Sequence, residues 1–106
     1  MLRLLAVAFI LSALPARAAE PEFALALRGH RFMPAELPVP ANTRIKLVIA
    51  NEDSTAEEFE SYSLNVEKRI KGNSSAAVFI GPLKPGRYDF VGEYHEKTAR
   101  GTLVAQ

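Results

Sequence analysis

The chain of 106 residues contains no cysteine and no tryptophan. The absence of cysteine excludes disulfides, cysteine nucleophiles, iron–sulfur ligation and any copper or zinc site that needs a thiolate. Without tryptophan, aromatic packing depends on six phenylalanines and three tyrosines. The sequence also has no glycine-rich phosphate-binding loop and no Gly-x-Ser-x-Gly elbow, so it offers neither a nucleotide-binding nor a hydrolase motif.

The N-terminal segment differs in composition from the rest of the chain. Arg3 gives it a basic start, residues 4–14 are almost entirely apolar, and a small-x-small triplet follows at residues 16–18. This order is typical of a secretory signal peptide, whose apolar core is too short to span a bilayer as a stable helix. The sequence therefore predicts a cleavable signal peptide at residues 1–18, one domain at residues 19–106 and a periplasmic location.

The predicted mature domain is close to electrically neutral. Removing Arg3 and Arg17 from the 13 basic residues leaves 13 − 2 = 11 against 12 acidic residues. Nucleic-acid binding relies on basic side chains that displace phosphate counterions, and the sequence has no basic stripe. A second long apolar run is also missing, so we expect neither a nucleic-acid partner nor insertion of the mature domain into a membrane.

Prolines and glycines divide the remaining chain into short segments, a spacing typical of β proteins. In the clearest segment, residues 43–50, Ile45, Leu47 and Ile49 alternate with more polar positions. Only one helical turn is expected, near residues 54–59. The pattern predicts an all-β, antiparallel Greek-key β-sandwich. About seven strands are expected, at residues 23–27, 36–40, 43–50, 61–66, 75–80, 87–94 and 101–105, the first two at sheet edges.

Side chains of the kinds that bind metal ions are concentrated in two segments of the sequence. Residues 51–61 carry five carboxylates, and residues 87–101 carry Glu93, His95 and Glu96. Crowded carboxylates within about 4–6 Å raise each other's pKa unless a cation offsets them. Oxygen and imidazole ligands without sulfur suit Fe, Mn, Zn or Cu(II).

The loops of a β-sandwich cluster at its two ends, which offers a route for these segments to meet. We therefore hypothesise a metal site that joins a glutamate of the first segment to His95. The candidate residues are Glu57, Glu58 and Glu60 with His95, and His30, Met33 and Glu93 as additional ligands.

The same residues have plainer interpretations. Ser54 and Thr55 stand three residues before Glu57 and Glu58, so either pair fits a capping box that begins a short helical turn. Glu60 is also suited to a weak surface pair with a lysine. A lone loop histidine is more often a surface residue than a ligand, and a lone methionine is more often core filler.

The order of several segments resembles the cupredoxin-like domains. Residues 32–40 fit the pattern Phe-x-Pro-x-x-hydrophobic-x-Val-Pro, and residues 51–53 place Asn-x-Asp at a strand end. A Pro-Gly-x-Tyr turn follows at residues 85–88, then a loop centred on His95, and finally Gly-x-Leu-Val at residues 101–104. The resemblance covers nearly the whole predicted domain and implies a cupredoxin-like Greek-key sandwich.

Three departures from the blue copper proteins bear on function. In those proteins a histidine precedes the phenylalanine, whereas this chain reads Glu57-Glu58-Phe59. Those proteins also have a cysteine at the position where this chain has Gly92. Their closing methionine has no counterpart in residues 96–100. A blue copper site needs the thiolate, so blue-copper electron transfer is not expected.

The glutamates are similar to those of EfeO-type cupredoxin domains and of the small periplasmic cupredoxin-like proteins of bacterial ferrous-iron uptake systems. This resemblance implies an iron or copper ion held first by Glu58 and His95, with Glu57, Glu60, Glu93 and His30 as further candidates. It implies two partners, an inner-membrane iron permease and a periplasmic iron-binding protein.

Two alternatives remain at this point. A ferroxidase activity would need an electron acceptor, and the sequence offers no second cofactor for that role. The other alternative is a non-catalytic structural or interaction β-sandwich with no metal site.

Overall fold

The computed structural model describes residues 3, 5–8 and 20–106, so the predicted signal peptide at residues 1–18 lies mostly outside the described residues. The described part is built from nine strands and one short 3-10 helix, η1. In chain order these are β1 (Glu22–Arg28), β2 (Arg31–Met33), β3 (Glu36–Val39), β4 (Ile45–Asn51), β5 (Glu57–Ser61), β6 (Val66–Ile70), β7 (Ser74–Ile80), β8 (Gly86–Gly92), η1 (Glu93–His95) and β9 (Arg100–Ala105). None of the helices among these residues has the length and apolarity to cross a bilayer.

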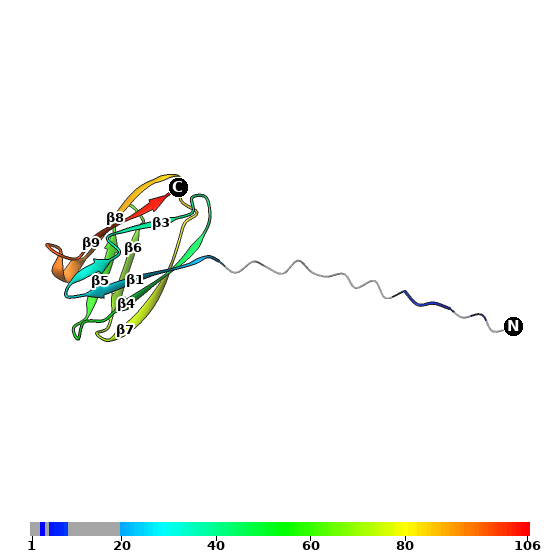
Figure 1. Ribbon diagram of the computed structural model, residues 1–106, viewed down its shortest axis with the longest axis horizontal. Coiled ribbons are helices and arrows are strands. Elements are labelled where there is room, and N and C mark those ends of the chain that lie inside the picture. Colours follow the sequence, from blue (N-terminus) through cyan, green and yellow to red (C-terminus); the bar gives the residue numbers. More distant parts are fainter. Residues whose placement is uncertain (1–2, 4, 9–19) are drawn as a thin grey trace.

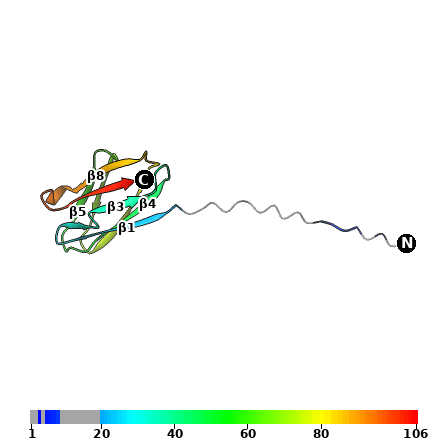
Figure 2. The ribbon, with the colours of Figure 1, turned by 45° about the horizontal axis from the view of Figure 1, so that its top comes forward.

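The strands form two sheets that pack as the two layers of a sandwich (Figures 1 and 2). The four-stranded sheet has the order β2-β1-β4-β7, and the five-stranded sheet has the order β3-β9-β8-β5-β6. The β1–β4 and β3–β9 pairs are parallel, and the other pairs are antiparallel. The predicted sandwich is therefore confirmed, although its sheets mix parallel and antiparallel pairing.

The core lies between the two sheets and follows the two-residue period of the strands. In β4 the side chains of Ile45, Leu47 and Ile49 are buried, as their alternation in the sequence predicts. Phe32 packs edge-on against Phe59 and Phe90, with ring centroids 6.1 and 5.1 Å away. These three phenylalanines come from β2, β5 and β8, so they join both sheets at one end of the sandwich.

The strands differ from the sequence-based expectation in number and in position. Nine are present rather than about seven, because β2, β5 and β6 were not expected and the strand expected at residues 61–66 is absent. β1 is not an edge strand, since it lies between β2 and β4. The pattern at residues 54–59 is not helical, because residues 57–61 pair with β6 on one side and with β8 on the other.

The strand expected at residues 61–66 is in fact a hairpin turn between β5 and β6. The backbone N–H of Asn65 donates to the carbonyl of Tyr62 at 3.1 Å, and that of Leu64 donates to the hydroxyl of Ser61 at 3.2 Å. Asn65 has a φ of 52°, a left-handed conformation that asparagine tolerates better than most residues. The local side-chain alternation was therefore outweighed by turn chemistry.

Candidate functional site

Strand β5 divides the candidate glutamates between two faces. Because successive side chains of a strand point to opposite faces, Glu57, Phe59 and Ser61 are buried, whereas Glu58 and Glu60 lie toward the outer face. Glu57 therefore belongs to the end of the core, and its two acidic neighbours belong to the outer surface of the five-stranded sheet.

The inner glutamate, Glu57, is in direct contact with His95. Its carboxyl oxygen Oε2 lies 2.6 Å from Nδ1 of His95, and its other oxygen accepts hydrogen bonds from the backbone N–H groups of Tyr94 and Glu58 at 2.8 and 3.0 Å. Glu57 is only 1% exposed, whereas the side chain of His95, at the end of η1, is 30% exposed. A buried carboxylate thus holds a half-buried imidazole.

His30 stacks on the same imidazole. The ring centroids of His30 and His95 are 3.5 Å apart and their planes differ by 12°. His30 lies in the tight turn between β1 and β2, where Gly29 and His30 have φ values of 58° and 55°. We call Glu57, His95 and His30 the imidazole site.

The turn that carries His30 is held by Asp53. The backbone N–H groups of Gly29 and His30 donate to the two carboxyl oxygens of Asp53 at 2.7 and 2.9 Å. Partial burial works against ionisation of Asp53, but these two hydrogen bonds and the nearby histidines outweigh it and hold the pKa below the usual value.

Asp53 is in turn positioned by Asn51, which is 2% exposed. The Asn51 side-chain carbonyl accepts the backbone N–H of Asp53 at 3.1 Å, and its amide lies within hydrogen-bonding distance of three backbone carbonyls between 2.9 and 3.3 Å. The Asn-x-Asp at the end of β4 is therefore a scaffold for the imidazole site.

On the outer face, four carboxylates converge. One oxygen from each of the four residues lies within 4.8 Å of the others; we call them the glutamate cluster, and they are Glu58, Glu60, Glu67 and Glu93. Glu60 and Glu67 stand directly opposite each other on β5 and β6, a cross-strand pairing of like charges that is unfavourable by itself. Arg69, opposite Glu58, supplies some compensating charge.

The crowding moves the pKa values of these carboxyls apart. Hydrogen bonding with Glu58, followed by burial and the charges of Glu58 and Glu60, raises the pKa of Glu93 to about 7. Hydrogen bonding with Glu58 also raises the pKa of Glu67. Glu58 receives those protons, together with the hydroxyl of Tyr94 at 3.2 Å, so its own pKa is lowered. The cluster is therefore partly protonated near neutral pH unless a cation neutralises it.

The sequence-predicted residues thus fall into two neighbouring groups. Glu57, His95 and His30 meet in the imidazole site, and Glu58, Glu60 and Glu93 meet in the glutamate cluster. Tyr94 links the two groups, because its backbone N–H binds Glu57 and its hydroxyl binds Glu58. Met33 is half exposed on β2.

One member of the cluster, Glu67, was missed by the reasoning from sequence. The missing signal was the hairpin between β5 and β6, since its register places Glu67 opposite Glu60. Because a strand was expected at residues 61–66, the hairpin there was not predicted. Asp53 was noted as one of the crowded carboxylates and as the end of the Asn-x-Asp motif, but its hydrogen bonds to the His30 turn required the structure.

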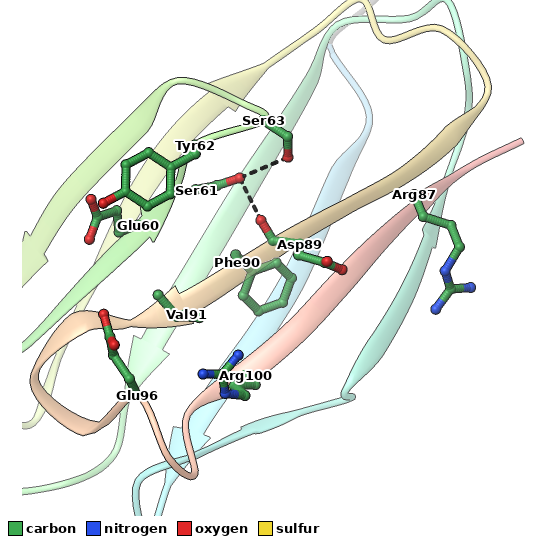
Figure 3. Close-up of a pocket in the computed structure, with 10 residues that line it drawn as sticks. All are labelled: Glu60, Ser61, Tyr62, Ser63, Arg87, Asp89, Phe90, Val91, Glu96 and Arg100. Carbon is green, nitrogen blue, oxygen red and sulfur yellow. Dashed lines mark hydrogen bonds between the residues drawn. The ribbon is translucent and has the colours of Figure 1, made fainter.

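A cavity of about 460 Å³ borders the glutamate cluster, where β5 and β8 separate beyond the Glu60–Val91 pair. The hydroxyl of Ser61 donates to the backbone carbonyl of Asp89 at 2.6 Å, and this hydrogen bond is one of the dashed lines in Figure 3. Phe90 and Val91 are the aromatic and aliphatic residues of β8 that line the cavity. Glu60 belongs to both the lining of the cavity and the glutamate cluster.

Comparison with known proteins agrees with this architecture. The family model described as a cupredoxin-like domain matches residues 1–105. An uncharacterised protein of Rickettsia prowazekii is 40% identical over 83 residues, which are 78% of this chain, and the chain spans 66% of that relative's length.

Solved structures at 13–14% identity share the fold. A copper-binding protein solved by NMR in its apo form superposes with a TM-score of 0.70 over 80% of this chain and 86% of its own. Auracyanin A, a blue copper protein of Chloroflexus aurantiacus, gives 0.70 over 83% of this chain and 100% of its own. The metal-binding domain of a Cu(I)-exporting ATPase of Streptococcus pneumoniae gives 0.64 over 80% and 84%. The two-sheet architecture and the match of the family model along almost the whole sequence lead to one conclusion: this chain belongs to the cupredoxin-like domain family.

Proposed function

We propose that this protein binds a metal ion through imidazole nitrogens and carboxylate oxygens, and that iron is the ion it handles in the periplasm. The observation that carries the proposal is the meeting of His30 and His95 beside Glu57, with ring centroids 3.5 Å apart. Two histidines brought together from distant loops and backed by a carboxylate are typical of transition-metal sites.

The donor atoms of the chain decide which kind of ion fits. The sequence has no cysteine, so the residues present do not fit a blue copper centre, which needs a thiolate. They do fit an ion bound by nitrogen and oxygen, such as Fe(II), Mn(II), Zn(II) or Cu(II). His95 is the first ligand that we propose in the imidazole site, and Glu58 is the first in the glutamate cluster.

The glutamate cluster supports a hard ion such as iron. Its four carboxyls repel one another, as the raised pKa values of Glu67 and Glu93 indicate. A bound cation would remove that repulsion, and carboxylate oxygens are good ligands for iron in both of its common oxidation states. Handover to an inner-membrane iron permease and a periplasmic iron-binding protein is part of the proposal, and its support is the resemblance to iron-uptake proteins.

The experiment that tests this function is a titration of the purified protein with Fe(II) under anaerobic conditions, with Mn(II), Zn(II) and Cu(II) in parallel. We expect saturable binding that His95→Ala weakens by more than the roughly 10- to 100-fold typical of losing an outer-shell partner. Glu96→Gln, a charge change next to His95 but outside both groups, is the matched control and should bind normally.

Binding to the original protein that is no tighter than binding to His95→Ala would contradict the proposal. Cu(II) binding alone would not identify the physiological ion, because Cu(II) binds most nitrogen and oxygen sites more tightly than other divalent ions do. Metal-dependent oxygen uptake during Fe(II) turnover would distinguish a ferroxidase from a binding protein.

A structural or interaction role is the second candidate, and one observation favours it. Strand β7 is an edge strand that carries no charged residue, and Phe79 on it is half exposed. Such an edge is open to pairing with another strand. This alternative predicts that replacing Glu57, Glu58 and His95 together leaves the function of the protein intact.

A further inference from the structure

The two sheets end in the strands β2, β7, β3 and β6, and three of these edges are protected against pairing with another chain. β2 has only three residues, and β3 is a four-residue strand that contains Pro38. β6 carries three consecutive exposed and charged residues, Glu67, Lys68 and Arg69. Short length, proline and charge are the usual means by which edge strands avoid association. Among the sheet ends that the structure describes, β7 is left unprotected.

Strand β7 has the features that favour pairing with a further strand. It is seven residues long, reads Ser-Ser-Ala-Ala-Val-Phe-Ile, and contains neither proline nor a charged residue. Within the described residues it pairs with β4 along its whole length and with no strand on its other side. Ser75, Ala77 and Phe79 are exposed on its outer face, and Phe79 is 49% exposed. A strand added here would continue the backbone hydrogen bonds of the sheet and cover part of that aromatic ring.

The order of side-chain sizes along β7 suits a second copy of the same strand in antiparallel orientation. Its first four residues are serines and alanines, and its last three are Val78, Phe79 and Ile80. If Ala77 lies on a two-fold axis, positions 74, 75 and 76 face positions 80, 79 and 78 of the second copy. Every large residue then faces a small one. The exposed ring of Phe79 lies opposite Ser75 of the second copy, which leaves room for it.

The charges beside β7 also suit the antiparallel arrangement. β6 contacts β7 at the same margin of the sandwich, so the two-fold axis would bring two copies of β6 near each other in opposite directions. The run Glu67-Lys68-Arg69 then lies against its own reverse, and the glutamate of each copy comes near basic residues of the other. The chain has 13 basic and 12 acidic residues, so there is little net repulsion between two copies.

We propose that this protein forms a two-fold symmetric dimer by antiparallel pairing of β7 with β7 of a second copy, which joins the two four-stranded sheets into one continuous sheet. Such a contact uses the same patch on both chains. A single strand pair is small compared with the interface of an obligate dimer, so the association depends on protein concentration. The dimer does not depend on the proposed metal site, and a protein that binds no metal would still form it.

The first test measures the molecular mass of the purified protein by analytical ultracentrifugation over a range of concentrations. We expect the mass to rise toward twice that of one chain. Ala77→Lys places two lysines directly opposite each other on the axis, so the dissociation constant should rise by about fivefold. Ala24→Lys is the matched control, because Ala24 is also exposed on the outer face of this sheet but lies on β1, away from the β7 edge. It should associate as the unaltered protein does.

Two outcomes of this test would overturn the proposal. If the unaltered protein has the mass of one chain at every concentration, a second copy is not what occupies the edge, and a strand of a different protein becomes the candidate. If Ala24→Lys weakens the dimer as much as Ala77→Lys does, the contact lies on the face of the sheet and not at its edge.

The second test determines the register and does not require Ala77→Lys to fold. Because the chain has no cysteine, a single introduced cysteine can form a disulfide only with its counterpart in another copy. Directly opposed residues on antiparallel strands have Cβ atoms about 4.5–5.5 Å apart, close to the separation in a disulfide, so Ala77→Cys should give linked dimers under mild oxidation. Ser75→Cys lies on the same face of β7, but its two copies are four residues apart along the strands, about 13 Å. It should cross-link at least about tenfold more slowly, and equal rates for the two variants would overturn the proposed pairing.

Discussion

An ideal Cβ on Gly92 would lie 2.7 Å from the carboxyl carbon of Glu57 and 2.7 Å from the Cβ of Ala99. The carboxyl group of Glu57 therefore occupies the space that a side chain at position 92 would need. Gly92 is also the position at which the sequence resemblance places the cysteine of blue copper proteins. The glutamate and the glycine are sterically coupled, because the carboxyl group of Glu57 fills the space that the missing side chain at position 92 leaves.

Gly92→Ala should lower the free energy of unfolding by about 1–3 kcal/mol, the usual range for overpacking. It should also disturb the contact between Glu57 and His95, because Glu57 is the neighbour that must move. Denaturant unfolding measures the first effect and NMR of the His95 ring measures the second. Gly29→Asn is the control, because Gly29 has open space around it and a φ of 58°, which asparagine tolerates. Equal stability of the two variants would contradict the steric argument.

Asn51→Leu should be strongly destabilising even though leucine has a similar size. It removes the amide that faces the carbonyls of Thr55, Ile70 and Lys71, and a buried group left without a partner costs about 1–3 kcal/mol. We expect a loss of that order in urea unfolding, together with weaker metal binding because Asp53 loses its support. Asn42→Gly, at a left-handed position elsewhere, should do neither. A variant that keeps its stability but loses metal binding would show that Asn51 acts on the site without supporting the fold.

Glu67→Lys should stabilise the protein in the absence of metal and weaken its binding of hard cations. The change converts the Glu60–Glu67 cross-strand pair from like to opposite charge, so a repulsion is replaced by an attraction. Thermal unfolding without metal and Mn(II) titration measure the two effects, which are expected to have opposite signs. Glu96→Lys makes the same charge change outside the glutamate cluster. If it reproduces both effects, net charge and not the cluster is responsible.

The stability of the metal-free protein should fall as the pH rises from about 5 to about 7. Glu93 has a folded-state pKa of about 7 against 4.5 for an ordinary glutamate, so in this range the folded protein holds a proton that the unfolded chain releases. Glu67 acts in the same direction, whereas the lowered pKa of Glu58 contributes only at more acidic pH. Glu93→Gln should flatten this decline relative to Glu96→Gln in unfolding measured across the range. An unchanged slope in Glu93→Gln would contradict the assignment.

Much of the fold could be predicted from sequence because the core follows simple periodicity. Ile45, Leu47 and Ile49 alternate and are buried on one face of β4, and the order of short segments indicated a cupredoxin-like sandwich that the structure and the family match confirm. Residues 54–59 were harder to interpret. Their capping-box spacing is a local signal, and the structure replaces it with long-range pairing of β5 to β6 and β8, which one sequence does not reveal.

The candidate site was predictable in its residues but not in its grouping. The sequence resemblance named Glu58 and His95 as the first ligands, whereas the glutamate in contact with the imidazole is Glu57. Which glutamate makes that contact depends on which face of β5 points inward, and the helical interpretation of the segment concealed it. The stack of His30 on His95 depends on a left-handed turn held by Asp53, a contact between residues 23 positions apart in the chain.

The side chain of Phe59 keeps Glu57 on the core face of β5 and Glu58 and Glu60 on its outer face. Phe59 is fully buried, and its neighbours on β5 alternate around it. If the pairing register of β5 shifted by one residue, Glu58 and Glu60 would face the core and Glu57 would face water. Such a shift would expose the buried ring of Phe59 to water, which is unfavourable. Phe59 has no ligand atom of its own, and yet its burial determines that Glu57 is the carboxylate that contacts His95.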